Sequence, residues 1–151
     1  CVLPLRFGAT LAGADHETQQ LLGQIGTKLG MAFQLADDLL GVFGTEAETG
    51  KSVLSDLREG KRSFLVQQGL LLAKPAQRRQ LRATLGNPDC DAAMAAQAQE
   101  ILTQCGARQA VEARMQAAVT EADRLIAALP ISPDAQQQLR AFAKQIIWRS
   151  A

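Results

Sequence analysis

Two adjacent carboxylates and several downstream cations are the residues of this sequence best suited to chemistry. Asp37 and Asp38 lie in a mostly apolar stretch that has helical spacing. Neighbouring acids in such a setting are unfavourable unless their charge is compensated, and a divalent cation does this well. Mg²⁺ takes one or two carboxylates and completes its coordination with water and substrate phosphate. The residues suited to hold diphosphate oxygens are Lys51, Lys61 and Arg62. The pattern therefore predicts a metal–diphosphate site.

A nucleotide-binding P-loop is the competing interpretation, because Gly50-Lys51-Ser52 has the form of its last three residues. The full motif needs a glycine where Thr45 stands, and Gly44 lies one residue too far upstream. It also needs a preceding strand that aims the loop at the start of a helix. A long helix is expected here instead, so the lysine is better explained by diphosphate than by a P-loop.

One long helix must position the aspartates. We expect Asp15 to cap it and Gly44 to end it. Its apolar face carries Leu22, Ile25, Leu29, Phe33, Ala36, Leu40 and Phe43. At about 100° per residue a second stripe forms, made of Gly23, Thr27, Gly30, Gln34, Asp37, Asp38 and Gly41. Glycines, an amide and two acids are unusual on a solvent face, so this stripe is interpreted as a cavity wall. Gln34, one turn before the acids, would share their pocket.

The remaining sequence also indicates helices. Residues 1–14 already have a helical pattern, and Thr45–Lys61 is expected to be a loop. Further helices are expected over 63–73, from Pro75 to about Gly86, over 88–104, over 107–129, and from the cap Ser132 to Trp148. Strand-like alternation and a domain linker are both missing from the sequence. The prediction is an all-α fold with residues 1–151 in one domain.

Composition excludes several classes of protein. The chain has 47% hydrophobic and 4% aromatic residues, which favours helices over strands. A net charge of +1 gives no field for nucleic acid or an anionic membrane. No apolar run reaches the roughly 18 residues that a membrane span needs. Three cysteines without metal-ligand spacing or a disulfide framework make a reducing, cytoplasmic location the default expectation.

The segment from Gly30 to Ser63, GMAFQLADDLLGVFGTEAETGKSVLSDLREGKRS, resembles the second aspartate-rich region of the trans-isoprenyl diphosphate synthases. That family has Phe-Gln-x-x-Asp-Asp-x-x-Asp, then Gly-Lys, then Asp-Leu-x-x-Gly-Lys. The matching residues are, in order, Phe33, Gln34, Asp37, Asp38, Gly50, Lys51, Asp56, Leu57, Gly60 and Lys61. Upstream and downstream helices are similar to the family's C-terminal part, although only this segment is highly specific.

The resemblance implies an all-helical bundle around a central cavity, of the isoprenoid synthase type and usually homodimeric. It implies a prenyltransferase that condenses an allylic diphosphate with isopentenyl diphosphate to a linear trans-polyprenyl diphosphate. Asp37 would bind the Mg²⁺ on the allylic diphosphate, and Asp38 would support that ion directly or through water. Gln34 would face the substrate and the developing allylic cation. Lys51 and Lys61 would hold the leaving diphosphate, with Arg62 as a further substrate-binding cation.

Two departures qualify the resemblance. Gly41 stands where the family has its third aspartate, and we expect this variation, and a Gly41→Asp change, to be tolerated. The family's first aspartate-rich motif is not in this sequence, and residue 1 is Cys in a helical stretch. We therefore expect the C-terminal half of a synthase. The alternatives are a truncated, non-catalytic partner or regulatory subunit of a synthase, and a plain helical bundle without a site.

Overall fold

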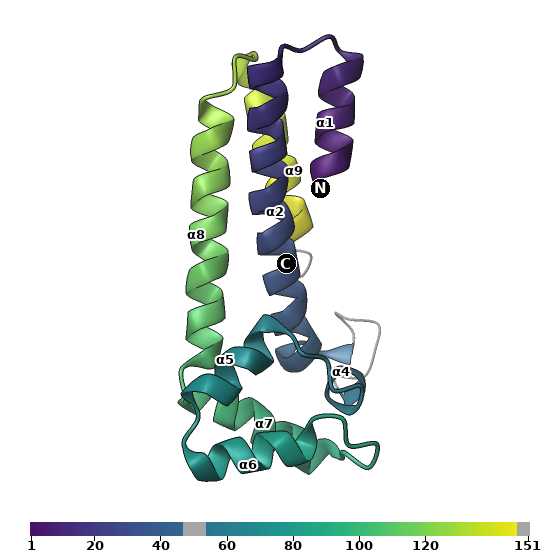
Figure 1. Cartoon of the computed structure of the whole chain (residues 1–151), viewed down its shortest axis with the longest axis vertical. Coiled ribbons are helices and arrows are strands. Elements are labelled where there is room, and N and C mark those ends of the chain that lie inside the picture. Colours follow the sequence, from purple (N-terminus) through teal and green to yellow (C-terminus); the bar gives the residue numbers. More distant parts are fainter. Residues whose placement is uncertain (47–53, 148–151) are drawn as a thin grey trace. The chain divides into compact units, whose positions relative to one another are not determined.

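The protein is all-α in the computed structural model, which describes residues 1–46 and 54–147 (Figure 1). Within those ranges there is no strand, which confirms the predicted fold class. The helices are α1 (Val2–Leu11), α2 (His16–Phe43), α4 (Leu54–Arg58), α5 (Phe64–Leu72), α6 (Pro75–Thr84), α7 (Ala92–Gln104), α8 (Ala107–Ala127) and α9 (Pro133–Ile147). Of the described residues, no helix is both long and apolar enough to cross a bilayer.

Two compact units share the chain. The first contains Cys1–Gln34 with Arg114–Ala151, and the second contains Leu35–Ala113. Helices α2 and α8 each contribute to both units, so the boundary falls inside continuous helices. The expectation that residues 1–151 form a single domain stays a prediction.

The first unit is built on α1, α8, α9 and most of α2. Its core holds aliphatic and small side chains that are almost fully buried: Ala9, Ile25, Leu29, Ala32, Met115, Ala118, Ala122, Leu125, Ile126, Leu129, Ala143 and Ile147. Helix α1 approaches α2 closely at Gly26, where an added Cβ would lie 2.8 Å from the Cα of Val2. A glycine is needed there because any side chain would collide with the backbone of α1.

The second unit packs α5, α6 and α7 against one another, and α4 against α7. Its core includes Leu35, Val42, Leu57, Leu65, Val66, Ala73, Leu81, Cys90, Ala95, Ala98, Ile101, Leu102, Ala107 and Val111. The last nine residues of α2 belong to this unit, and they carry both aspartates of interest. The candidate chemistry is therefore anchored in the second unit.

The predicted helix starts are mostly confirmed. Asp15 accepts a hydrogen bond from the backbone N–H of Thr18 at 2.8 Å, and this bond lowers the pKa of its carboxyl. Ser132 Oγ likewise accepts from the N–H of Ala135 at 3.2 Å. Both are N-caps that satisfy an otherwise unpaired donor of the first turn.

Two expectations about the helices are wrong. The stretch Thr45–Lys61, expected to be loop, contains helix α4. The helix expected over 88–104 begins only at Ala92, because Asn87 Oδ1 accepts from the N–H of Asp89 at 2.9 Å and closes a turn first. Asp91 then becomes the N-cap and accepts from the N–H of Met94 at 2.8 Å.

Candidate metal–diphosphate site

The C-terminal end of helix α2, which carries the two aspartates, is fixed by buried side chains, a hydrogen bond and a cation–π contact. Leu35 and Val42 are buried on either side of the acidic pair. The amide Nε2 of Gln99 on α7 donates to the backbone carbonyl of Val42 at 2.6 Å, which satisfies one of the unpaired carbonyls at the helix end. The guanidinium of Arg108 lies 4.7 Å from the ring centroid of Phe43, a cation–π contact.

The two aspartates have different surroundings. Asp37 is exposed, whereas Asp38 is half-buried. Oδ2 of Asp38 accepts a hydrogen bond from the backbone N–H of Phe64 at 2.9 Å, at the start of α5. A carboxylate there is favourable because the N–H groups of the first turn have no acceptor within the helix and form the positive end of the helix dipole. Asp38 thus links α2 to α5, while Asp37 faces solvent.

The stripe interpreted as a cavity wall is partly covered by helix α1. Gln34 precedes the acids by one turn of α2 but is exposed and belongs to the first unit. Gly23 and Gly30, which come earlier in the same stripe, face residues at the start of the chain. A Cβ added to Gly23 would lie 3.2 Å from the Arg6 side chain, and one added to Gly30 would lie 3.8 Å from the Cys1 side chain. Helical spacing predicts which residues form the stripe, but it does not show that α1 covers part of that stripe.

The segment from Asp56 to Lys61 folds back on itself through a glycine. Helix α4 ends at Arg58, and Gly60 adopts the left-handed conformation with φ +65°. The N–H of Lys61 then donates to the carbonyl of Asp56 at 3.3 Å, and the N–H of Gly60 donates to the carbonyl of Leu57 at 3.1 Å. This is a Schellman-type helix end, which favours glycine at the left-handed position. It returns Lys61 to the side chain of Asp56.

Neighbouring chain segments fix this turn in place. Leu57 is 1% exposed, and its carbonyl accepts from the N–H of Gly86 at 2.8 Å. Arg58 Nε and Nη2 both donate to the carbonyl of Cys90, at 2.9 and 2.7 Å. An added Cβ on Gly60 would lie 3.0 Å from the Cα of Gly86, so the two loops meet backbone to backbone.

Lys61 lies among carboxylates. Its ammonium group is 2.5 Å from Asp56 Oδ1 and 3.9 Å from Glu59 Oε2. The hydrogen bond to Asp56 is the main cause of a raised pKa for Lys61, and the charges of Glu59 and Asp37 also contribute to it. The ammonium therefore stays protonated at neutral pH. Asp56, the partner of this lysine, also lies against Gly41 of α2, so the lysine is near the helical turn that carries the acidic pair.

The sequence analysis assigns no role to Asp56, but the side chain of Asp56 lies against helix α2. An added Cβ on Gly41 would collide with Oδ2 of Asp56. The expectation that Gly41→Asp is tolerated stays a prediction, and this change would require the carboxylate of Asp56 to move. The spacing Asp-x-x-x-Gly-Lys in the sequence is compatible with a Schellman turn, which brings Asp56 and Lys61 together. The contact between Asp56 and Gly41 has no such signal in the sequence.

Other predicted site residues are placed as follows. Arg62 is exposed and directly follows Lys61. Lys51 lies outside the residues that the structure describes. Among the described residues, no group of three or more His, Cys, Asp or Glu side chains is arranged to hold a metal ion. The donors nonetheless suit Mg²⁺, which commonly binds one or two carboxylates and leaves its other positions to water and phosphate.

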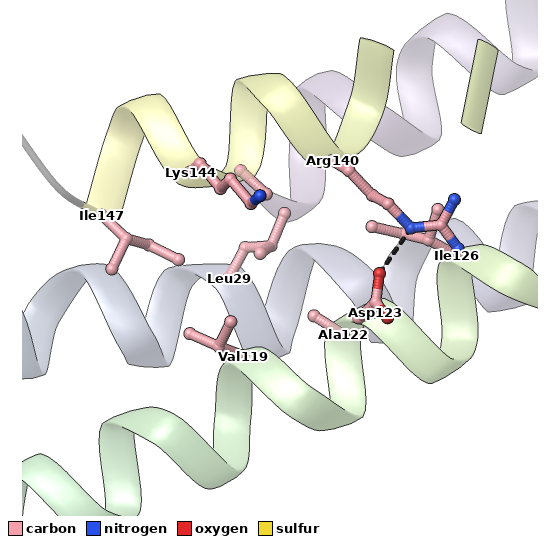
Figure 2. A pocket seen from close by; sticks show the side chains of 9 residues that line it. Leu29, Val119, Ala122, Asp123, Ile126, Arg140, Lys144 and Ile147 are labelled. Carbon is pink, nitrogen blue, oxygen red and sulfur yellow. Dashed lines mark hydrogen bonds and ion pairs between the residues drawn. The ribbon is translucent and has the colours of Figure 1, made fainter. Parts of the chain in front are cut away.

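A separate pocket of about 300 Å³ lies in the first unit, among α2, α8 and α9 (Figure 2). Its lining is mostly aliphatic and contains none of the predicted site residues. Its one carboxylate, Asp123, is paired with Arg140 at 2.5 Å, from Oδ1 to Nε. Because this acid is already paired with an arginine, it is poorly suited to bind a metal ion.

We expect Asp38→Ala to lower stability as well as any activity of the site. The change removes the acceptor of the Phe64 N–H at the start of α5, and losing such a cap costs about 1 kcal/mol. Thermal unfolding of the whole protein measures this cost, with Asp89→Ala, an exposed acid of the same unit, as the control. An unchanged melting temperature for Asp38→Ala would contradict the capping role.

Comparisons with known proteins identify sequences similar to this chain. Residues 1–102 match the polyprenyl synthetase family. A geranylfarnesyl diphosphate synthase from Aeropyrum pernix is 33% identical over 145 residues, which are 95% of this chain and 44% of that protein. A (2E,6E)-farnesyl diphosphate synthase from Mycobacterium tuberculosis is 34% identical over 148 residues, covering 95% of this chain and 41% of its own length.

Solved structures show the same relationship. A geranylgeranyl pyrophosphate synthase from Corynebacterium glutamicum, complexed with isoprenyl diphosphate and magnesium, superposes with a TM-score of 0.89 at 34% identity. The match covers 95% of this chain and 41% of that one. A decaprenyl diphosphate synthase from Rhodobacter capsulatus has a TM-score of 0.81 at 29% identity, with 97% and 45% covered. The chain thus spans less than half the length of these similar proteins.

Proposed function

This chain belongs to the polyprenyl synthetase family, and from that premise we propose that the whole protein is a trans-prenyltransferase. It would condense an allylic diphosphate with isopentenyl diphosphate and give a linear trans-polyprenyl diphosphate. The relatives are named as synthases of this kind, which favours an enzyme over a non-catalytic partner subunit. The present residues would form the part of the enzyme that carries the second aspartate-rich region.

One structural observation supports this proposal more than any other. Oδ1 of Asp56 lies 2.5 Å from the ammonium of Lys61, and its Oδ2 lies against Gly41, three residues after Asp38 on α2, so this lysine lies near the acidic pair within the second unit. A carboxylate beside a protonated lysine is the arrangement that a metal-bound diphosphate needs. The carboxylate takes the metal, and the ammonium donates hydrogen bonds to phosphate oxygens.

Each candidate site residue is assigned a role in this reaction. Asp37, exposed at the end of α2, would hold Mg²⁺, and Asp38 would support that ion directly or through water. Lys61, and with it Lys51 and Arg62, would bind the diphosphate as donors. When bound, Mg²⁺ would neutralise charge on the leaving diphosphate and favour ionisation of the allylic C–O bond. Gln34 would face the allylic cation from one turn earlier.

The environment of the reaction would come from the whole protein. Gln34 and Asp37 are exposed in this chain, so a closed cavity requires a wall from the remaining part of the enzyme. Such a wall would keep water from the carbocation and strengthen the electrostatic contacts. Homodimerisation and a cytoplasmic location are further parts of the proposal, and they follow from the family resemblance and the cysteine pattern.

The test is an elongation assay on the whole protein. It is incubated with an allylic diphosphate and labelled isopentenyl diphosphate, with Mg²⁺ or with excess EDTA. We expect elongated product only with Mg²⁺. A purified, folded whole protein that elongates none of the C5 to C20 allylic diphosphates would refute the proposed function.

A further inference from the structure

Helix α6 and the chain that leads into it are strongly basic. Residues 60–88 contain no Asp or Glu and have these basic residues: Lys61, Arg62, Lys74, Arg78, Arg79 and Arg82. The first two belong to the candidate metal–diphosphate site, whereas the other four lie at the start of α6 and along it. Because the net charge of +1 is a sum over the whole chain, it does not show this local excess of positive charge.

The exposed face of α6 carries two of these arginines. Leu81 and Thr84, which are 2% and 4% exposed, lie on the buried face of the helix. At about 100° per residue, Pro75, Arg79 and Arg82 fall on the opposite face, and all three are exposed. None of the four cations of this region forms an ion pair with a carboxylate among the residues that the structure describes. Their positive charge is therefore available to an external anion.

A carboxylate of the adjoining helix α7 is linked to α6 only through two amides. Gln77 Nε2 donates to Gln104 Oε1 at 3.3 Å, and Gln104 Nε2 donates to Glu100 Oε1 at 2.8 Å. Gln77 is half-buried, on the side of α6 that packs against α7. Glu100 is thus oriented by a neutral amide and leaves the arginines on the other side of α6 unpaired.

Two exposed leucines lie at the turn between α5 and α6, which pack against each other (Figure 1). Leu71 and Leu72 end α5 and are 68% and 46% exposed. Arg78 Nη2 donates to the carbonyls of Leu71 and Ala73, at 3.2 and 3.1 Å, so this half-buried arginine joins the end of α5 to α6. The turn that carries the leucines is therefore fixed next to the basic helix.

We propose that this surface, made of Leu71, Leu72, Lys74, Arg79 and Arg82, binds the surface of an anionic lipid bilayer. The three cations would lie at the level of the lipid phosphates, to which basic clusters on helices are attracted. The two leucines would enter the boundary between headgroups and acyl chains. Attachment would be peripheral, since no helix of the described residues is long and apolar enough to cross a bilayer.

A bilayer suits this surface better than a nucleic acid does. Proteins that bind single strands stack the bases on aromatic side chains, and residues 71–82 include no aromatic residue. Exposed leucines gain nothing from a phosphate backbone, whereas a bilayer takes up both the apolar and the cationic side chains. The inference goes beyond the proposed function, because lipid binding of this kind requires neither metal nor prenyl substrate.

The experiment is flotation of the whole protein with lipid vesicles. One kind contains phosphatidylcholine alone, and the other contains an equal amount of phosphatidylglycerol. We expect binding to the anionic vesicles only. Raising the salt from about 0.1 M to about 1 M should release the protein, because the screening length falls from about 10 Å to about 3 Å. Absence of binding to the anionic vesicles, or equal binding to both kinds, would overturn the proposal.

Three variants test the residues. Arg79→Gln/Arg82→Gln should lower the vesicle partition coefficient at least about tenfold, since each cation at an anionic surface contributes to binding. Leu71→Gln, which leaves the charge intact, should lower it at least about threefold. Lys28→Gln/Arg124→Gln removes the same charge from α2 and α8 of the first unit and should leave the coefficient nearly unchanged. Equal losses in the two double variants would show that net charge alone, and not this surface, drives binding.

Two further measurements distinguish the alternatives. Labelled single-stranded RNA should not bind, and arginine-dependent RNA binding by a protein that ignores vesicles would replace the lipid with a nucleic acid. A protein that binds anionic vesicles but elongates no prenyl chain would support this surface and refute the proposed function. An active prenyltransferase that floats with neither kind of vesicle would refute only the lipid-binding surface.

Discussion

Replacing Asp37 by alanine in the whole protein should lower kcat at least about a hundredfold, the scale of losing one preorganised electrostatic stabiliser. Asp37 is the exposed member of the acidic pair, and its charge contributes to the raised pKa of Lys61. Without its carboxylate the metal would lose a protein ligand, and the charge of the leaving diphosphate would be less well neutralised. Steady-state kinetics at saturating Mg²⁺ and both diphosphates measure the effect.

The free energy of unfolding of the same variant is the control for this prediction. Because Asp37 is on the surface, Asp37→Ala should change the free energy of unfolding by no more than about 0.5 kcal/mol. Asp38→Ala, in contrast, should reduce both kcat and stability. Full turnover by a folded Asp37→Ala variant would show that the aspartate does not bind the metal.

A polypeptide limited to these 151 residues should form no elongated product, whereas a version extended upstream through the family's first aspartate-rich motif should be active. The chain covers 44% of the Aeropyrum pernix relative, so much of the cavity would be missing. Lys61 and Asp37 would still be present, but the substrate site would be open to water, which competes for the carbocation.

Exposed apolar side chains lead to a second expectation for the short polypeptide. Leu3, Phe7 and Leu11 follow one face of α1 and are 82%, 67% and 73% exposed. Such a stripe favours association, so the short polypeptide should aggregate or bind a partner. Light scattering and the release of labelled product measure both properties. A monodisperse, fully active short polypeptide would show that the remaining part is dispensable.

The apolar face predicted for the long helix differs from this stripe of α1. It includes Leu29, Phe33 and Leu40. Leu29 is 1% exposed, and Phe33 and Leu40 are half-buried. Helical periodicity identified an apolar face correctly, but it could not identify which helices of the same chain cover that face.

Local sequence determined the helices and the candidate site residues. Hydrogen bonds that span three or four residues depend only on neighbouring side chains, so Asp15 and Ser132 could be recognised as caps directly. The acidic pair and Lys61 were likewise recognisable from residue type and spacing. Helix α4 was missed because its five residues lie among charges and glycines that are typical of a loop.

Only the tertiary structure decided which of these groups bind other parts of the fold and which are exposed. Asp37 and Asp38 are equivalent in the sequence, yet one is exposed and the other binds the Phe64 N–H across 26 residues of chain. Asp56 also makes a contact between distant segments. Helix α4 packs against α7 within the second unit, and the carboxylate of Asp56 lies against Gly41 of α2. Contacts between distant segments depend on how whole helices pack, and residue spacing within one segment carries no record of that packing.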